Sequence, residues 1–274
     1  MSIENKQPLF TNPLETAQGL SIDDLNKYLP ALHKIEDLIM TADKMKDGIF
    51  LGTALDGIRK IPDNTIDLII ANPPEKPKLN PFEHGSRMTI KEYFEWNEFW
   101  IKEGQRVLKP TGAIYLICGW KFSGMYHSII NNNFQLQTRI SWRDINSKDK
   151  SNQITWKNEI SDIWFATKTN EFMFNQEIAN NIYLKQQFDP TTTNLWNDII
   201  DFKNIEHSKI EEDKPAQLIE RILSASSFKL NWILDPFTRS GGIGVASKKM
   251  GRRFIGFESN KDKLLMAMKR IDKE

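Results

Sequence analysis

The chain has 274 residues, 39% of them hydrophobic and 11% aromatic, which is enough for one large globular domain with a substantial core. Basic and acidic residues nearly cancel, so the formal net charge is +1, and the overall charge neither requires nor excludes a polyanionic partner. The single cysteine, Cys118, rules out a disulfide framework and a cysteine zinc site. Because we find no leader-like start and no apolar run of about 20 residues, we expect a cytoplasmic protein.

Residues 1–46 are expected to form an N-terminal arm followed by helices. The first 20 residues are polar and contain prolines. From residue 21 onward, leucine and isoleucine recur at helical spacing, and Ser21 with Asp24 has the pattern of a capping box. Pro30 lacks an amide donor, so it either starts a second helix or kinks the first.

Between residues 48 and 119, short apolar runs alternate with amphipathic segments. The runs predict strands at 48–52, 65–71 and 113–119, and the segments between them predict helices at 54–61 and 89–108. Fully apolar strands that are separated by helices are typical of a parallel sheet with helices on both faces. The sequence therefore predicts an α/β fold.

Two β-rich runs follow, at residues 136–144 and 159–169, and they flank a polar, largely basic stretch. This pattern predicts an antiparallel hairpin at one edge of the sheet with a long exposed loop. Residues 170–210 contain many amides and show weak periodicity, so we expect an irregular insertion here. Residues 211–274 return to alternating helices and strands, which favours a single domain over residues 47–274.

The segment from residue 231 to 258 has the features of a nucleotide-type binding site. A strand ends at Asp235, a glycine-rich turn follows, and a second strand ends at Glu258, about 20 residues later. Glycines let the backbone approach a ligand closely, and a carboxylate at a strand end can accept hydrogen bonds from ribose hydroxyls. The segment predicts a ligand that contains ribose, with a glycine turn that serves only helix packing as the alternative.

A second candidate site is the sequence Asn72-Pro73-Pro74-Glu75, which directly follows the strand at 65–71. By itself it fits a proline-terminated strand that enters a loop. Like Asp235, however, Asn72 comes directly after a parallel strand, and ligands gather at the carboxyl ends of such strands.

Taken together, the two segments resemble the amino-group DNA methyltransferases that use S-adenosylmethionine, in the permuted (beta-type) order. The family's cofactor signature reads D-P-F-x-G-S-G, then a helix and G-R-x-F-I-G-x-E, and Asp235–Gly241 and Gly251–Glu258 stand in those places. The resemblance covers about residues 48–274, with a catalytic half at 47–169 and a cofactor half at 211–274. It implies a Rossmann-like methyltransferase fold with a mostly parallel sheet.

The resemblance also implies a reaction. The side-chain oxygen of Asn72 and a nearby backbone carbonyl would accept hydrogen bonds from the exocyclic amino group of a flipped base, so that its nitrogen faces the methyl group on sulfonium. An asparagine at this place favours N6 of adenine, with N4 of cytosine and RNA as less favoured targets. The residues expected in catalysis are Asn72, Pro73, Pro74 and Glu75. The residues expected to bind the cofactor are Thr53, Ala54, Lys214, Asp235, Pro236, Phe237, Arg239, Ser240, Gly241, Gly242 and Glu258.

Glu75 departs from the family pattern, which has an aromatic side chain that stacks on the extruded base. Phe82, Trp96 and Trp100 are candidates to compensate, although the helical spacing of the two tryptophans favours the core. A further hypothesis is an ion pair between Glu75 and Arg239 across the mouth of the cleft.

Three other positions also depart from the family. Arg239 replaces the first glycine of the cofactor turn, and Thr53 stands where an aspartate commonly helps to hold the cofactor. Only Lys214-Pro215 remains of an H-P-T-Q-K-P segment. Together with Glu75, these changes keep open a second class of function, a weak or inactive methyltransferase fold that acts as a DNA-binding or partner subunit.

Basic residues near the catalytic segment and in the hairpin are expected to contact DNA phosphates, although a solvated charged face is the simpler explanation for any one of them. These residues are Lys76, Lys78, Arg87, Arg139, Arg143, Lys148, Lys150 and Lys157. The amide-rich hairpin loop and the insertion at 170–210 are the candidates for reading the DNA sequence. The four histidines lack ligand spacing, so no metal site is expected. A homodimer or a heteromeric partner subunit is left open.

Overall fold

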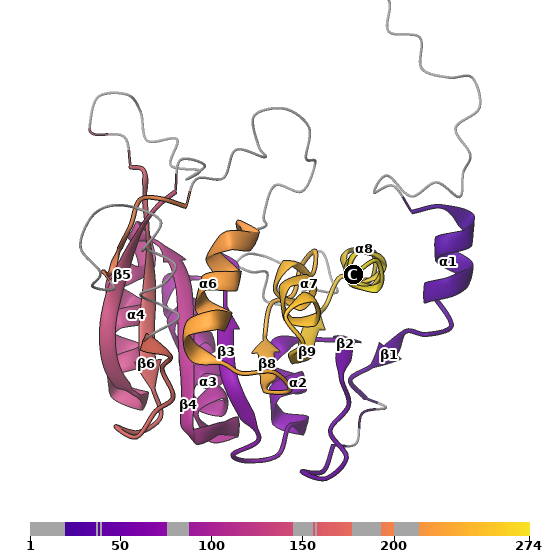
Figure 1. Cartoon of the computed structure of the whole chain (residues 1–274), viewed down its shortest axis with the longest axis horizontal. Helices are drawn as coiled ribbons and strands as arrows, with labels where there is room; N and C mark the ends of the chain where they lie inside the picture. Colours follow the sequence, from indigo (N-terminus) through magenta and orange to yellow (C-terminus); the bar gives the residue numbers. More distant parts are fainter. Residues whose placement is uncertain are drawn as a thin grey trace, which may run out of the picture.

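The computed structural model describes residues 20–36, 38, 40–75, 88–144, 156, 158–176, 193–199 and 214–274. In this part of the chain, nine strands form one sheet in the order β1-β2-β9-β8-β3-β4-β6-β5-β7 (Figure 1). Neighbouring strands are parallel except that β6 is antiparallel to both β4 and β5. The strands are β1 (His33–Lys34), β2 (Gly48–Leu51), β3 (Ile66–Ala71), β4 (Leu108–Gly119), β5 (Gln135–Arg143), β6 (Ile160–Thr167), β7 (Leu195–Trp196), β8 (Trp232–Asp235) and β9 (Arg253–Glu258).

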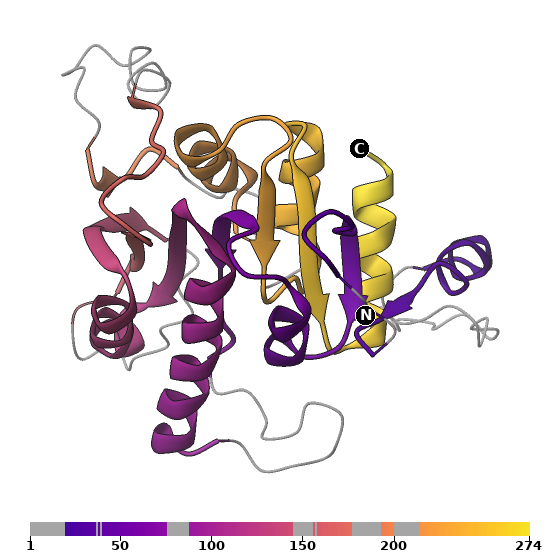
Figure 2. The same cartoon turned by 90° about the horizontal axis from the view of Figure 1, so that it is seen from below.

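Helices cover both faces of this sheet. One hydrophobic cluster packs the sheet against α2, α3 and α4, and a second packs its other face against α6, α7 and α8 (Figure 2). None of the helices in the described ranges is long and apolar enough to cross a membrane. The helices are α1 (Ile22–Tyr28), α2 (Ala54–Lys60), α3 (Ile90–Val107), α4 (Trp120–Asn133), α6 (Ala216–Ser226), α7 (Gly242–Lys249) and α8 (Lys261–Asp272).

The central strand β3 explains why an apolar run predicts this architecture. Five of its six residues are completely buried, and the strand has a parallel neighbour on each side, β4 and β8. Burying one such aliphatic side chain stabilises the fold by about 1.5–3 kcal/mol. The predicted α/β fold is confirmed, and so is the antiparallel hairpin, formed by β5 and β6. Strand β7 lies outside this hairpin, so the hairpin is near the edge of the sheet rather than at it.

Pro30 neither starts a second helix nor kinks the first, so this expectation was wrong. Helix α1 ends at Tyr28, and the two residues His33–Lys34 pair with β2 as a short parallel strand. Just beyond them, the Ile35 N–H donates to the Leu51 carbonyl at 3.1 Å. The backbone groups at the edge of β2 need hydrogen-bond partners, and this tertiary requirement overrides the local helical spacing.

Helix α1 is tied to α8 by charged contacts. The expected capping box is present, because the Asp24 N–H donates to Ser21 Oγ at 3.1 Å and the Ser21 N–H donates to the Asp24 carboxylate. The same carboxylate accepts a hydrogen bond from Lys269 Nζ at 2.6 Å, and Asp272 accepts one from Lys27 Nζ at 2.5 Å. These contacts attach the N-terminal helix to the last helix of the domain.

We expect the attachment of α1 to α8 to weaken in acid. The hydrogen bonds from Lys269 and Ser21 hold the pKa of Asp24 at about 2, below its ordinary value of 3.8. Because the folded pKa is lowered, the contact stabilises the folded state fully above pH 3.8, and this contribution is lost as the pH falls toward about 2. Hydrogen exchange should show α1 losing protection over this range while β3 keeps it. Asp24→Asn should lower the hydrogen-exchange protection of α1 already at neutral pH. If α1 of the wild type were protected equally above pH 3.8 and near pH 2, the prediction would be contradicted.

Candidate active site

The carboxyl ends of the parallel strands bring the two predicted segments together. Asn72 follows β3, Asp235 ends β8, and these two strands are hydrogen-bonded neighbours. The link is direct, because Arg239 Nη2 in the turn after β8 donates to the Asn72 carbonyl at 3.2 Å. Glu258 ends β9, the neighbour of β8 on the other side. Segments about 160 residues apart in the sequence therefore share one edge of the sheet.

The turn after β8 has the backbone of a ligand-binding turn. Asp235 is buried, and its Oδ1 accepts a hydrogen bond from the Phe237 N–H at 3.1 Å. Gly241 has a φ of 84°, and a Cβ added there would lie 2.9 Å from the Cβ of Ala267, so this position needs glycine for both conformation and space. Arg239 also has a positive φ, 50°, which is uncommon for a residue with a side chain.

Glu258 presents a buried carboxylate beside this turn. Its Oε1 accepts a hydrogen bond from the Asn260 N–H at 2.8 Å, and the backbone N–H of Arg239 also donates to the carboxylate. Burial raises the pKa of Glu258, while these N–H donors and Lys263 act in the opposite direction. A carboxylate held in this way can accept hydrogen bonds from a pair of ribose hydroxyls, so its chemistry fits an adenosine-containing cofactor.

Most of the predicted cofactor residues lie in this region. The residues on or directly after β8 and β9 are Asp235, Pro236, Phe237, Arg239, Ser240, Gly241, Gly242 and Glu258. Thr53 and Ala54 are close to them, because the Gly52 N–H donates to the Glu258 carbonyl at 3.0 Å. The Thr53 side chain caps α2 by accepting from the Asp56 N–H. Within the described residues, no cluster of three or more histidine, cysteine, aspartate or glutamate side chains could hold a metal ion.

Lys214 is placed differently from the other predicted cofactor residues. Its Nζ lies 3.2 Å from Asp144 Oδ2 and 5.0 Å from the centre of the Trp142 ring, at the end of β5. Strands β3, β4 and β6 separate β5 from β8 in the sheet. The structure therefore brings the Lys214 ammonium group to the end of β5 and not to the turn after β8.

The predicted catalytic segment, Asn72 to Glu75, is held by a tyrosine that the sequence alone did not single out. Tyr93 of α3 donates to the Pro74 carbonyl at 3.0 Å, and Tyr126 of α4 lies 2.7 Å from the Tyr93 oxygen. A carbonyl only accepts, so the Tyr93 hydrogen is used there, and Tyr126 must be the donor to Tyr93. Burial raises the pKa of both hydroxyls, which keeps them protonated. Tyr93 lies one turn before Asn97 on the buried face of α3, and this periodicity is the signal that could have identified it.

Glu75 lies on the other side of the segment, against the end of β4. A Cβ added to Gly119 would be 2.7 Å from Glu75 Oε1, so the absence of a side chain at Gly119 makes room for the carboxylate. The Arg239 guanidinium instead reaches the Asn72 carbonyl. The hypothesis of a Glu75–Arg239 ion pair is therefore wrong. The carboxylate is exposed, and its charge contributes to raising the pKa of Cys118, for which burial is the main cause.

Two aromatic residues of α3 pack against the turn after β8. The Phe237 ring lies 5.4 Å from Trp96 and 5.2 Å from Trp100, and Trp100 is completely buried. The core position expected for Trp100 is confirmed, while Trp96 is partly buried and stacks on Tyr93 at 6.0 Å. Phe82 lies outside the described residues.

Comparison with known proteins agrees with this arrangement. A family model for N6/N4 methyltransferases, described as DNA methylase, matches residues 66–269, which is more than half of the chain. The chain belongs to this DNA methylase family.

Several relatives of this methylase are type II methyltransferases. M.HpaI of Haemophilus parainfluenzae is 26% identical over 242 residues, which cover 84% of this chain and 76% of the relative. M2.DpnII of Streptococcus pneumoniae is 27% identical over 243 residues, 79% of this chain and 86% of the relative.

Solved structures share the fold of the methylase. A protein of Thermus thermophilus, described as a DNA modification methylase, has a TM-score of 0.63 and 19% identity over 84% of this chain and 96% of its own. The cytosine-N4-specific PvuII DNA methyltransferase has a TM-score of 0.65 and 18% identity over 83% of this chain and 87% of its own.

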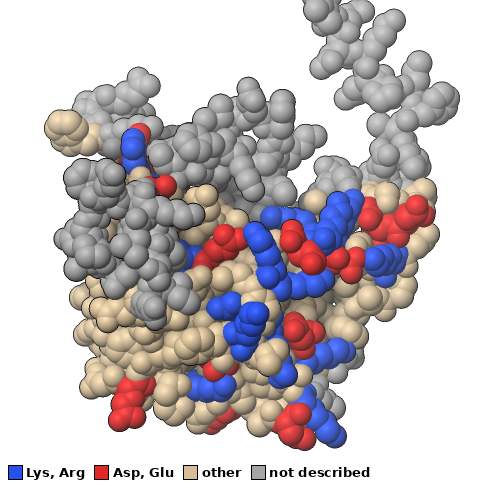
Figure 3. Space-filling model, in the orientation of Figure 1, with Lys and Arg blue, Asp and Glu red and all other residues tan. Residues whose placement is uncertain are grey.

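Two of the basic residues expected to contact DNA are described, and each faces an acidic side chain. Arg139 Nε lies 3.2 Å from Asp162 Oδ1, and Arg143 Nη2 lies 3.3 Å from Glu159 Oε2. Both arginine side chains are about half exposed, at 55% and 51%. On the face of the methylase in Figure 3, lysine and arginine side chains likewise alternate with acidic ones. The residues outside the described part of the chain are Lys76, Lys78, Arg87, Lys148, Lys150 and Lys157.

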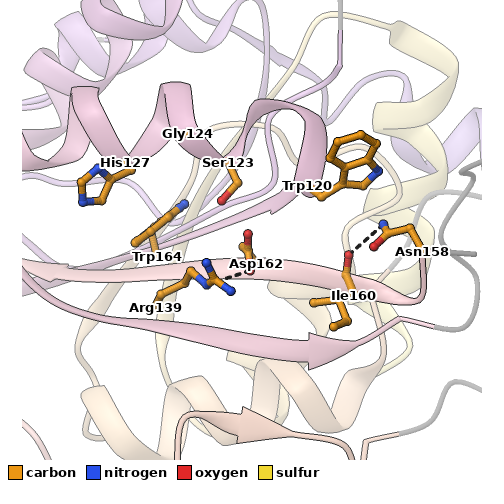
Figure 4. Close-up of a pocket in the computed structure, with 9 residues that line it drawn as sticks. All are labelled: Trp120, Ser123, Gly124, His127, Arg139, Asn158, Ile160, Asp162 and Trp164. Carbon is orange, nitrogen blue, oxygen red and sulfur yellow. Dashed lines mark hydrogen bonds and ion pairs between the residues drawn. The ribbon is translucent and has the colours of Figure 1, made fainter. Parts of the chain in front are cut away.

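A hollow of about 580 Å³ lies between α4 and the β5–β6 hairpin (Figure 4). Its lining includes Trp120, which directly follows Gly119, the glycine at which an added Cβ would meet the Glu75 carboxylate. The described residues that line it include Arg139, which was expected to contact DNA phosphates, and Asn158 of the amide-rich hairpin loop, which was expected to read base edges. The hollow does not include the segment from Asn72 to Glu75. Its lining residues are Trp120, Ser123, Gly124, His127, Arg139, Asn158, Ile160, Asp162 and Trp164.

Proposed function

We propose that this methylase transfers a methyl group from S-adenosylmethionine to the N6 amino group of an adenine within a specific DNA sequence. The observation that carries the proposal is the contact between the cofactor turn and the catalytic segment, in which Arg239 Nη2 donates to the Asn72 carbonyl at 3.2 Å. The contact puts Asn72 beside the turn after β8, as methyl transfer between neighbouring sites requires. In this proposal the chain has the permuted order, with its catalytic half at 47–169 before its cofactor half at 211–274.

The carboxyl ends of β8 and β9 would hold the cofactor. The Glu258 carboxylate would accept hydrogen bonds from the ribose hydroxyls, and the turn from Asp235 to Gly242 would contribute backbone groups to the rest of the site. S-Adenosylmethionine supplies an electrophilic methyl group on a sulfonium centre. Phe237 gives the turn a rigid support, because its ring packs on Trp96 and Trp100.

The base is held by the segment after β3. The side-chain oxygen of Asn72 and the Pro73 carbonyl accept the two hydrogens of the exocyclic amino group, so that its nitrogen lone pair is directed at the cofactor. The prolines have no N–H groups that could compete with the amino group for these two acceptors. The neutral amide of Asn72 is no base at ordinary pH, so its role is to orient the amino group, and the proton released after methyl transfer passes to water.

The choice of adenine rests on the asparagine at position 72. The PvuII methyltransferase shares the fold and is cytosine-N4-specific, so the fold is compatible with either base. DNA from cells that express the protein should be sequenced with a method that detects modified bases, and its nucleosides should be separated by mass spectrometry. We expect N6-methyladenine in one short sequence context. N4-methylcytosine would overturn the choice of base, and the absence of both would favour an inactive DNA-binding subunit.

A further inference from the structure

The catalytic segment is tethered from two sides through its backbone. Arg239 Nη2 donates to the Asn72 carbonyl at 3.2 Å, and the Tyr93 hydroxyl donates to the Pro74 carbonyl at 3.0 Å. Since neither proline has an N–H group, the backbone of Pro73 and Pro74 can be fixed by hydrogen bonds only through the carbonyls. The carbonyl between the two tethers belongs to Pro73, a buried residue.

These tethers leave two acceptors for a substrate. Among the described residues, none donates a hydrogen bond to the Asn72 side-chain oxygen or to the Pro73 carbonyl. An exocyclic amino group has two hydrogens and therefore needs two acceptors that converge on one point. The Asn72 and Pro74 carbonyls each already accept one hydrogen bond, so the Asn72 side-chain oxygen and the Pro73 carbonyl are the acceptors of this segment that carry no donor from the described residues.

Arg239 occupies a position whose backbone favours glycine. Its φ is 50°, and a glycine would adopt this conformation without a side-chain penalty. A glycine, however, has no group that could reach Asn72. The backbone N–H of Arg239 also donates to the Glu258 carboxylate. A single residue thus contacts the group expected to hold the ribose and the segment expected to hold the base.

Tyr93 is connected to the same turn through aromatic packing. Its ring stacks on Trp96 with 6.0 Å between centroids, and Trp96 lies 5.4 Å from Phe237, two residues before Arg239. The second hydroxyl, of Tyr126, donates to the Tyr93 oxygen and so orients its hydrogen toward Pro74. The packed rings of Trp96 and Phe237 therefore connect Tyr93 with the turn that carries Arg239.

We propose that Arg239 and Tyr93 are positioning residues that clamp the catalytic segment, and that Arg239 couples the cofactor turn to the base-binding acceptors. This inference rests on the proposed function, since it assigns roles in methyl transfer. The clamp fixes the Asn72 and Pro74 carbonyls. The Asn72 side-chain oxygen and the Pro73 carbonyl then keep the spacing that the two hydrogens of an amino group need. The arginine that departs from the family pattern thereby has a role in this chain, as a link between the two halves of the site.

The clamp is tested with Arg239→Gly and Tyr93→Phe in the full-length protein, with S-adenosylmethionine and duplex DNA that carries the recognition sequence. Each variant is expected to lower kcat about tenfold or more, because small misplacements of reacting groups are costly. The dissociation constant of S-adenosylmethionine, measured by calorimetry, and the KM for DNA should stay within about twofold. The double variant should lose less than the product of the two single losses, since both tethers hold one segment.

Tyr115→Phe is the matched control. Tyr115 is also buried, and its hydroxyl lies 2.8 Å from Ser226 Oγ, but it belongs to the other hydrophobic cluster of the sheet. We expect this variant to keep the kcat of the wild type. Unchanged kcat in both test variants would overturn the clamp. A parallel loss of Tm, cofactor affinity and kcat would also overturn it, because such a loss would indicate that Arg239 and Tyr93 have a structural role only. A wild type without methyl transfer would refute the proposed function instead, and the two failures are therefore distinguishable.

Discussion

Asn72→Ala should lower kcat for methyl transfer by about a hundredfold or more, with little change in the affinity for S-adenosylmethionine. The substitution removes one of the two acceptors that orient the amino group, and poor orientation of reacting groups is costly in rate. It leaves the two tethers intact, because both act on backbone carbonyls, so the fold and the cofactor turn should be preserved. Single-turnover assays with labelled S-adenosylmethionine measure the first effect, and calorimetry measures the second.

Two variants serve as comparisons for Asn72→Ala. Asn72→Asp keeps an acceptor oxygen in the same place, so it should retain much more activity than the alanine variant. Asn133→Ala removes an asparagine at the end of α4 whose amide donates to the Ile129 carbonyl, and its kcat should be unchanged. If Asn72→Ala kept full activity, the amino group would have to be held elsewhere, and the proposed mechanism would be wrong.

The second large effect is expected for Glu258. Glu258→Ala should weaken the binding of S-adenosylmethionine about a hundredfold, because hydrogen bonds to a charged group contribute about 1.5–3 kcal/mol each. Glu258→Gln keeps one acceptor oxygen and should bind with intermediate affinity. Calorimetric titration of the three proteins measures this order, and circular dichroism verifies that each is folded. Equal affinities would show that the carboxylate does not hold the ribose.

Binding should also depend on pH through the same group. Burial raises the pKa of Glu258 above its ordinary value of 4.5, so the carboxyl group takes up a proton at a higher pH than an exposed glutamate. In the free protein, the stability that this group contributes is present below pH 4.5 and is lost as the pH rises through the raised pKa. Ribose hydroxyls bind more strongly to the ionised carboxylate than to the neutral carboxyl group, so cofactor affinity should increase with pH over this window. Glu258→Gln should remove this dependence.

The main elements of the fold and the meeting of the two candidate segments at one edge of the sheet could be predicted from the sequence. Residues 66–71 are an uninterrupted apolar run apart from Asp67, which indicates a strand buried on both faces, and Asn72 and Asp235 stand at the ends of two such strands. The glycine at 241 needs a positive φ, and that requirement is visible in the sequence as a turn signal. Local patterns thus sufficed wherever backbone conformation and burial repeat with a fixed period.

Contacts between distant side chains could not be predicted in the same way. The sequence does not show that Arg239 reaches Asn72 while Glu75 lies against Gly119, because a long side chain can take several directions from one backbone position. Lys214 is likewise found at the end of β5, with Asp144 and Trp142 as its partners. The short strand after Pro30 depends on the free edge of β2, which exists only when the sheet has formed.

By itself, the sequence of this methylase determined the α/β architecture, the hairpin and the two strand ends, because apolar periodicity and turn chemistry act between residues close together in the chain. The tertiary structure alone decided which backbone carbonyls are occupied and by which side chains. Tyr93 of α3 and Arg239 of the turn after β8 reach the segment from Asn72 to Glu75 only when the sheet is assembled, and Tyr126 of α4 then hydrogen-bonds to Tyr93. The reason is physical, because hydrogen bonds of this kind depend on distances that packing sets and that sequence spacing does not encode.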